Sequence, residues 1–279
     1  MIVHLIDGTY ELFRHFYGSL RATGGKPARF GAVAGVLNTV LQMIAEGATH
    51  VGVATDHVIE SFRNELWDGY KTGAGIDPAL YAQFEPLEDA LRAMGVVVWA
   101  TVDLEADDAL ASAAEIASHD PRVEKICIWT PDKDLAQCVR GDRVVQVDRR
   151  SKVVRDAAEV RSKFGVNPEF IPDYLALVGD AADGYPGIKG IGAKGAASLI
   201  TRYHGIESFP PEVLGNHRTL ALLFKKLATL ITDAKLFESV DELEWRGPTA
   251  EFSTFSERLG ASNLVARANK AAELSKTRR

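Results

Sequence analysis

Short apolar runs alternate with amphipathic segments along the first half of the chain. The apolar runs are rich in valine and isoleucine, which is typical of strands buried on both faces of a sheet. They cover residues 1–7, 50–56, 95–102, 125–130 and 143–148. Hydrophobic residues at helical spacing predict helices between the strands, at 31–46, 78–94 and 106–119. The pattern therefore predicts an α/β fold with a mostly parallel central sheet that helices cover on both faces.

The pattern changes near Asp156, after which the chain has helical character and short turns rich in glycine and proline. A chain of 279 residues can form one large domain, or a core with a smaller appended module. We therefore predict an α/β core over residues 1–155 and a helical region over residues 156–279. Ligands of open α/β sheets bind beyond the carboxyl ends of the strands, so the chemistry is expected at that edge.

Nine carboxylates form five short clusters, and four of these clusters lie where an apolar run ends. Their side chains would converge at one edge of the sheet, where mutual repulsion is strong unless cations lie between them. Ligands that are all oxygen favour Mg²⁺ or Mn²⁺ over zinc. The sequence thus predicts a metal site, whose candidate ligands are Asp7, Asp56, Glu105, Asp107, Asp108, Asp132, Asp134, Asp180 and Asp183.

Two of these clusters also fit a purely structural role. Glu105, Asp107 and Asp108 open a predicted helix, and the N-terminus of a helix favours negative charge. Three acids in four positions exceed what capping requires, so metal ligation is favoured. Asp132 and Asp134 lie on a strand-to-helix turn, where one of them can also cap the helix.

The net charge of −6 argues against a nucleic-acid partner only until the charges are located. Without the nine clustered carboxylates the net charge would be +3, and residues 185–226 contain six lysines and arginines but two glutamates. A basic segment beside an acidic metal centre favours a polyanionic substrate. Scattered surface charge explains the counts equally well, so the motifs must decide between the two.

Targeting signals and reactive cysteines are not evident. No apolar run approaches membrane-spanning length, and no basic region precedes an apolar stretch at the N-terminus. Cys127 and Cys138 do not have the spacing of a metal site, and Cys127 lies in an apolar run. We therefore expect a cytoplasmic protein that has no membrane partner.

Residues 186–200, PGIKGIGAKGAASLI, are the most specific stretch of the sequence. Its glycines bracket a tight apolar hairpin, and an alanine-rich helix follows. Glycine lets backbone amides approach a phosphate closely, and the N-terminus of the following helix adds positive potential. Such a helix–hairpin–helix module, expected at about 168–204, grips the DNA backbone without reading sequence. The candidate DNA contacts are Gly187, Lys189, Gly190, Gly192 and Lys194.

Asp7-Gly8-Thr9 after a strand also invites comparison with haloacid-dehalogenase-type phosphatases. Those enzymes carry a nucleophilic aspartate two residues before such a motif. Here that position is Leu5, which cannot attack phosphorus, so this interpretation ranks well behind.

Taken together, these motifs resemble those of the 5′-nuclease (flap endonuclease) family. The similarity is greatest to the 5′→3′ exonuclease domain of bacterial DNA polymerase I and its free-standing relatives. It runs from Ile2 to about Ser208 and implies a PIN-like or resolvase-like core, with no polymerase domain in the chain. Five motifs in the family's order carry it: LIDGTYELFR, VATDHVIESFRNELWDGYK, LEADDALA, TPDKDL and VGDAADGYPGIKGIGAKGAASLI.

The resemblance implies a site for two metal ions. The first ion would be held by Asp7, Asp56, Glu105 and Asp107, and the second by Asp132, Asp134 and Asp183 with Asp107 shared or close by. Asp108 and Asp180 would be outer-shell ligands. Two such ions activate the attacking water and stabilise the leaving 3′ oxygen, which gives a 5′-phosphate and a 3′-hydroxyl. A potassium ion at the hairpin turn is a further expectation.

The run FRNELWDGYK leads into the family's arch over the active site, expected at about residues 63–90. By the resemblance, Arg63 and Lys71 would contact the scissile phosphate, although each also fits a plain surface cation. Tyr10 occupies the position of an aromatic that can stack on the terminal base, and a core tyrosine explains it nearly as well.

Two positions depart from the family pattern. Ala74 stands where relatives often carry an arginine, which implies weaker phosphate clamping by the arch or another cation in its place. Asp183-Gly184-Tyr185 replaces the usual Asp-Asn before the proline turn, which implies a looser approach to the hairpin. Both departures bear on rate and substrate preference more than on the reaction.

The sequence thus predicts a structure-selective, Mg²⁺- or Mn²⁺-dependent 5′ nuclease, acting as a monomer on DNA with 5′ flaps, nicks or 5′ ends in replication and repair. One alternative is a non-catalytic DNA-binding protein of the same fold, against which the intact acids argue. Another is a PIN-type metal-dependent RNase, against which the helix–hairpin–helix module argues. The balance of exonuclease and endonuclease action, and the role of residues 209–279, stay open.

Overall fold

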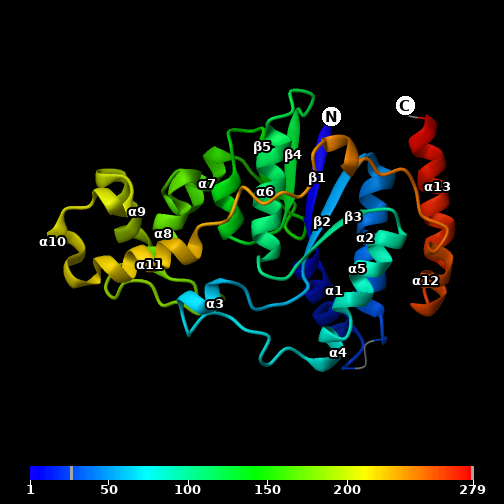
Figure 1. Ribbon diagram of the computed structural model, residues 1–279, viewed down its shortest axis with the longest axis horizontal. Coiled ribbons are helices and arrows are strands. Elements are labelled where there is room, and N and C mark those ends of the chain that lie inside the picture. The colour runs from blue at the N-terminus through cyan, green and yellow to red at the C-terminus, as the bar shows by residue number, and fades with distance from the viewer. Residues whose placement is uncertain (26–27, 278–279) are drawn as a thin grey trace.

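A computed structural model describes residues 1–25 and 28–277 of the protein. Within these residues, six strands form one sheet in the order β3-β2-β1-β4-β5-β6, and Figure 1 labels the first five strands. The first five are parallel to their neighbours, and β6 runs antiparallel to β5. The mostly parallel sheet is confirmed, and β6 is an edge strand that the sequence analysis missed. The strands are β1 (Ile2–Asp7), β2 (His50–Asp56), β3 (Val97–Thr101), β4 (Lys125–Trp129), β5 (Val144–Asp148) and β6 (Val153–Arg155).

Helices cover both faces of the sheet, as predicted. Successive side chains of a strand point to opposite faces, so Ile6 packs among the helices of one face and Leu5 against those of the other. The first face is covered by α1 (Gly8–Ala22), α2 (Gly31–Glu46) and α5 (Phe84–Ala93), and the second by α6 (Ala106–Ser118). None of the described helices is long and apolar enough to cross a membrane.

The segment between β2 and α5 covers most of the span 63–90 that was expected to form the arch. It holds two single-turn helices, α3 (Arg63–Leu66) and α4 (Pro78–Tyr81), joined by an irregular stretch. The helix predicted over 78–94 is divided into α4 and α5 at residues 82–83. Of the span 63–90 expected for the arch, the part from Phe84 onward lies in α5, which packs into the core of the sheet.

The parallel register brings the acidic strand ends to one edge. Asp7 lies opposite Ala54, two residues before Asp56. Asp7 caps α1, which begins directly after β1, and its carboxylate accepts the N–H of Tyr10 at 2.8 Å. A Cβ atom at Gly8 would lie 2.7 Å from the side chains of Val53 and Thr55, so this tight turn requires glycine.

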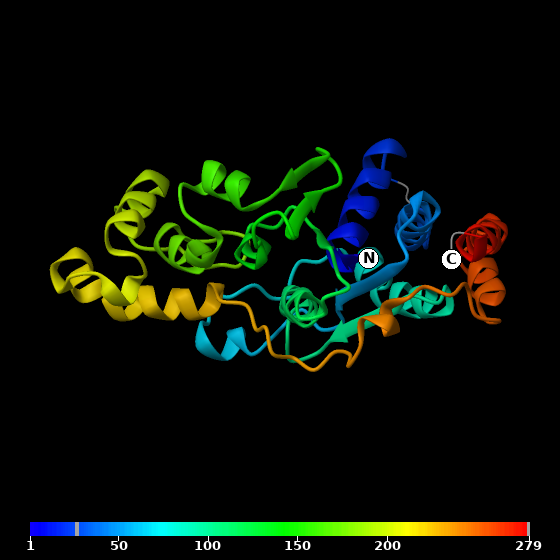
Figure 2. The ribbon, with the colours of Figure 1, turned by 90° about the horizontal axis from the view of Figure 1, so that it is seen from above.

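A second lobe of helices lies at one end of the molecule (Figures 1 and 2). Its own core includes Leu175, Ile200 and Phe224. The span 168–204, expected to form a helix–hairpin–helix, contains α8 (Ile171–Val178), a connecting turn segment and α9 (Ala193–Tyr203). A Cβ at Gly187 in that segment would lie 2.4 Å from the nitrogen of Gly179. The helices are α7 (Ala157–Phe164), α8 (Ile171–Val178), α9 (Ala193–Tyr203), α10 (Pro211–Leu214) and α11 (Arg218–Ala228).

After α11 the chain returns to the α/β lobe. Leu230 and Leu243 pack on the α6 face of the sheet, and Trp245 joins the core beneath α2. Then α12 (Phe252–Arg258) and α13 (Asn263–Thr277) pack beside α2, at the end of the molecule opposite the helical lobe (Figure 1). Residues 229–277 therefore complete the first lobe, in contrast to the single helical region expected over 156–279.

Candidate metal centre

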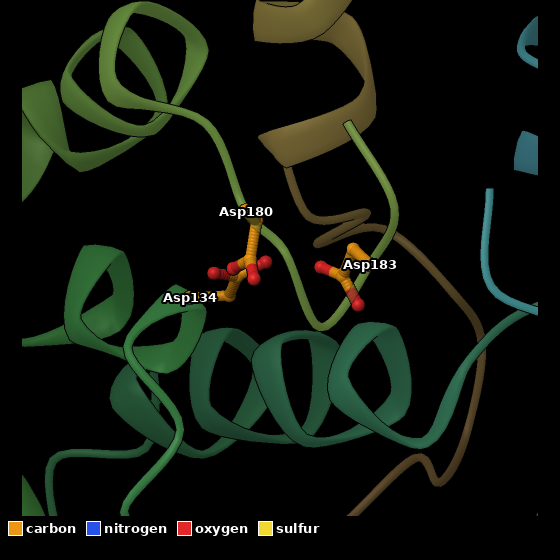
Figure 3. Close-up of side chains that lie close together, drawn as sticks. All are labelled: Asp134, Asp180 and Asp183. Atoms are coloured by element: carbon orange, nitrogen blue, oxygen red, sulfur yellow. The ribbon is translucent and has the colours of Figure 1, made fainter. Parts of the chain in front are cut away.

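The carboxyl edge of the sheet and the loop after α8 bring eight of the nine predicted ligands together. The tightest group is Asp134, Asp180 and Asp183, whose nearest carboxylate oxygens all lie within 4.8 Å of one another (Figure 3). Asp107 lies near this group, because its charge interacts with those of Asp132, Asp7 and Asp134. We call this region the acidic gap; its members are Asp7, Asp56, Glu105, Asp107, Asp132, Asp134, Asp180 and Asp183.

Burial and mutual repulsion raise the pKa values of acids in the gap. Burial, followed by the charge of Asp56, raises the pKa of Asp7 to about 7, although two hydrogen bonds oppose the shift. Burial and the charge of Asp132 raise the pKa values of Asp107 and Asp134 well above the usual range. Their anionic forms are therefore unfavourable unless positive charge is supplied nearby.

Two lysines supply part of that charge. The Nζ atom of Lys71 lies 2.7 Å from Glu105 Oε2 and 3.0 Å from Asp183 Oδ1. That of Lys133 lies 2.7 Å from Asp180 Oδ2. Although burial opposes it, the charges of Asp183 and Glu105 raise the pKa of Lys71 well above its ordinary value. Lys71 is therefore a firmly charged ammonium group inside the gap.

The donor set of the gap fits a hard divalent cation. Every candidate ligand is a carboxylate oxygen, which suits Mg²⁺ or Mn²⁺ better than softer metals. Asp134 Oδ1 is buried, and within the described chain it has no hydrogen-bond partner. Leaving a buried charged acceptor unsatisfied is costly, so this oxygen is available to a cation. Asp134, Asp180 and Asp183 are the residues best placed to hold one.

Asp108, the ninth predicted ligand, points away from the gap into a pocket that it shares with Arg63. The two guanidinium nitrogens of Arg63 donate to its two oxygens at 2.7 and 2.8 Å. The backbone N–H groups of Glu105 and Ile231 donate to the same carboxylate at 3.0 and 2.9 Å. A carboxylate has about four lone-pair sites, so none is left for a cation or its water. Asp108 thus caps α6 and pairs with Arg63, which differs from its expected place among the ligands.

Arg63 also uses its hydrogen-bond donors within the pocket that it shares with Asp108. We call this pocket the arginine pocket. Besides Asp108, Arg63 donates to Glu105 Oε1 at 3.1 Å and to the carbonyl oxygens of Leu227 and Thr229 at 2.8 and 3.1 Å. Its side chain is 1% exposed, so a DNA phosphate does not reach it. The placement differs from the expected phosphate contact: Arg63 joins the start of α3 to α6 and to the end of α11.

The remaining candidates for DNA contact are accessible to different degrees. Tyr10 is partly buried at the start of α1, next to Asp7. In the hairpin after α8 and the first turn of α9, Gly187 is buried against the chain, and four candidates are exposed. These four are Lys189, Gly190, Gly192 and Lys194.

Four polar residues around the gap were missed by the sequence analysis. Lys133 lies between Asp132 and Asp134, so its signal was present in the motif. The Ser61 and Tyr70 hydroxyls donate to Glu105 at 2.7 and 3.3 Å, and the Thr130 hydroxyl donates to Asp7 Oδ2 at 3.0 Å. These three also lie within the quoted motifs, but only the fold brings their hydroxyls to Glu105 and Asp7.

Known proteins share both lobes of this chain. A family model described as 5′-3′ exonuclease, N-terminal resolvase-like domain, matches residues 2–165, and one described as 5′-3′ exonuclease, C-terminal SAM fold, matches residues 166–251. DNA polymerase I of Pseudomonas aeruginosa is 34% identical over 261 residues. That match covers 86% of this chain and 28% of the polymerase, so the chain spans little more than a quarter of this relative.

A shorter relative matches over nearly its whole length. The 5′-3′ exonuclease of Buchnera aphidicola subsp. Baizongia pistaciae is 32% identical over 271 residues, which cover 90% of this chain and 89% of the relative. Among solved structures, the bacteriophage T5 D15 flap endonuclease in a complex with DNA and metal ions matches with a TM-score of 0.66 and 18% identity. It covers 99% of this chain and 100% of its own, and this likeness bears on the fold alone.

Proposed function

The chain belongs to the 5′-3′ exonuclease family, and from this premise we propose that it is a structure-selective 5′ nuclease using two divalent ions to hydrolyse DNA phosphodiesters. The observation that carries the proposal is the acidic gap, in which eight carboxylates from separate elements converge and Asp134 Oδ1 has no partner within the described chain. A purely structural cluster would be expected to satisfy its buried oxygens from the protein itself.

The acids of the gap divide into two ligand groups. We assign Asp7, Asp56, Glu105 and Asp107 to one ion, and Asp132, Asp134 and Asp183 to the other, with Asp107 between them and Asp180 acting through water. Mg²⁺ or Mn²⁺ bound there would activate the attacking water and stabilise the leaving 3′ oxygen. Asp7 and Asp56 end strands, and Glu105 and Asp107 stand at the start of α6, where the backbone is rigid, whereas Asp180 and Asp183 lie in the loop after α8.

Lys71 is the residue we assign to the scissile phosphate. Its side chain is 32% exposed, so it can meet a substrate that enters the gap, unlike Arg63. An ammonium group at that position donates to a phosphate oxygen and stabilises the charge that develops during cleavage. Tyr10, at the start of α1, is assigned to stacking on the terminal base.

The helical lobe supplies the duplex grip in this proposal. The exposed hairpin offers backbone amides at the start of α9, and Lys189 and Lys194 add positive charge. These contacts read the DNA backbone and not its sequence. We expect a monomer that acts on 5′ flaps, nicks and 5′ ends during cytoplasmic DNA replication and repair, with a potassium ion at the hairpin turn.

A cleavage assay on a labelled DNA flap tests the proposal. In Mg²⁺ or Mn²⁺ we expect a 5′-phosphate and a 3′-hydroxyl, and no product in a chelator. Faster cleavage of single-stranded RNA than of the flap would favour the PIN-type RNase. DNA binding without cleavage in either metal would favour the non-catalytic alternative.

A further inference from the structure

The base of the arch is fastened directly to the loop that carries Asp183. We call residues 61–71 the arch base. The N–H of Lys71 donates to the carbonyl oxygen of Asp183 at 3.0 Å, and the indole N–H of Trp67 donates to that of Gly184 at 3.1 Å. These two bonds flank the ion pair between Lys71 and Asp183. The indole ring also packs edge-on against Phe224 of α11, with 5.2 Å between ring centroids.

Two glycines allow the backbones to come this close. Gly184 has a φ of +85°, and a Cβ atom there would lie 2.0 Å from the carbonyl oxygen of Gly69. A Cβ at Gly69 would lie 2.7 Å from the indole nitrogen of Trp67 and 3.2 Å from the oxygen of Gly184. A side chain at position 184 would therefore push the arch base away from the loop. Gly184 is one of the two departures noted in the sequence, whereas the other, Ala74, is exposed farther along the arch.

The other side of the arch base is held as well. The side-chain amide of Asn64 donates to the carbonyl oxygen of Lys71 at 3.0 Å, and Tyr70 donates its hydroxyl to Glu105. The backbone of Lys71 is thus fixed at its N–H by the Asp183 loop and at its C=O by Asn64. Its ammonium group enters the acidic gap from a backbone held at both ends.

We propose that Trp67, Gly69 and Gly184 form a clasp that sets the position of Lys71 over the acidic gap. The inference rests on the proposed function, because Lys71 is the residue assigned there to the phosphate. Trp67 is then a positioning residue: it touches neither substrate nor reacting atoms, and it acts through Lys71. Misplacing a catalytic group by about 1 Å can slow a reaction by roughly a hundredfold, so a clasp of this kind affects the rate.

A double-mutant cycle distinguishes positioning from mere stability. Trp67→Phe keeps an aromatic ring against Phe224 but removes the N–H that reaches Gly184. We expect it to slow single-turnover cleavage of flap DNA about tenfold, while the Kd for DNA changes less than about twofold. In a Lys71→Ala background the same substitution should change the rate less than about twofold, because residues that act as a unit are not additive. Tenfold losses in both backgrounds would overturn the proposal.

Hydrogen exchange tests the clasp without DNA or metal. Gly184→Ala places a Cβ against Gly69, and Gly260→Ala is the matched control, since Gly260 also has a positive φ of +66° but has open space around it. We expect the Lys71 amide to exchange at least about tenfold faster in Gly184→Ala and Trp67→Phe, and to keep its protection in Gly260→Ala. Unchanged protection in Trp67→Phe would overturn the clasp. If the variants exchange as expected but the wild-type protein cuts no DNA, the proposed function is refuted and the clasp is still supported.

Discussion

Asp107 and Asp108 are neighbours in sequence, yet they belong to two pockets of opposite construction. In the arginine pocket, Asp108 receives four hydrogen bonds from Arg63 and two backbone N–H groups. In the acidic gap, burial and then neighbouring acids raise the pKa values of Asp107 and Asp134, and Asp134 Oδ1 has no partner in the described chain. The first pocket is complete by itself, and the second is not. The comparison teaches that unfilled lone pairs, more than the number of acids, identify a candidate metal site.

The largest expected effect is on cleavage. Asp134→Asn or Asp183→Asn removes a charged ligand from the gap, and we expect the single-turnover rate in Mg²⁺ to fall about a thousandfold. DNA affinity should stay within about threefold, because we assign the duplex grip to the helical lobe. Rates and Kd values on one flap substrate check both, with Asp142→Asn, an exposed acid outside both pockets, as the control. Wild-type rates in both gap variants would remove the metal assignment.

The next effect is on the stability of the arginine pocket. Arg63→Ala leaves the buried Asp108 charge alone, and we expect the free energy of unfolding to fall by about 3–5 kcal/mol. Adding Asp108→Asn should restore part of this loss, because neither charge is then left unpaired. Lys71→Met should cost much less, since Lys71 is partly exposed. Urea unfolding measures all three, and equal losses at Arg63 and Lys71 would mean that the two pockets do not differ.

A smaller effect on stability should have opposite signs when a carboxylate is neutralised in one pocket or the other. With a chelator present, Asp134→Asn relieves repulsion in the gap and should stabilise the protein by about 1 kcal/mol, whereas Asp108→Asn should destabilise it. Manganese at about a hundred times its Kd should stabilise the wild type by about 2.7 kcal/mol, and Asp134→Asn by less. Thermal melts with EDTA and with Mn²⁺ give both values. Destabilisation by Asp134→Asn in EDTA would contradict the comparison.

The smallest effect concerns cations that lie in neither pocket. Lys189→Ala or Lys194→Ala should weaken DNA binding and reduce the slope of log K against log salt by about 0.9 each. The cleavage rate of bound DNA should change little. Fluorescence anisotropy at several salt concentrations measures the slope, with the exposed Lys270 of α13 as the matched lysine. A slope equal to that of Lys270→Ala would place the hairpin outside the DNA contact.

The sequence was most informative where hydrophobic residues recur at the regular spacing of a strand or helix. Valine-rich runs predicted the parallel strands, and an acid after a run predicted a place at the carboxyl edge. The roles of Arg63 and Asp108 could not be predicted, because their partners include Leu227 and Ile231, more than a hundred residues away. Asp107 and Asp108 look alike in the motif, but consecutive residues of a helix point about 100° apart, and only the packing decides which faces the gap.

No periodic pattern in the sequence predicted the contacts of Gly184 or of the last helices. Gly184 read as a departure that loosens the approach to the hairpin, whereas in the fold it admits a close backbone contact with Gly69. Helices α12 and α13 carry apolar residues that could have faced either lobe. Their attachment to α2 depends on the path of residues 229–248, which carry few regular elements of their own.

The path of the chain after α11 bears on how the protein is assembled during synthesis. Trp245 and Leu264 are almost fully buried in the α/β lobe, although the whole helical lobe precedes them in the chain. The hydrophobic centre of the first lobe therefore stays incomplete on the ribosome until the second lobe has emerged. A polypeptide that ended at Ser208 would lack Trp245 and Leu264. An internal deletion of the helical lobe therefore preserves the α/β core better than a C-terminal truncation does.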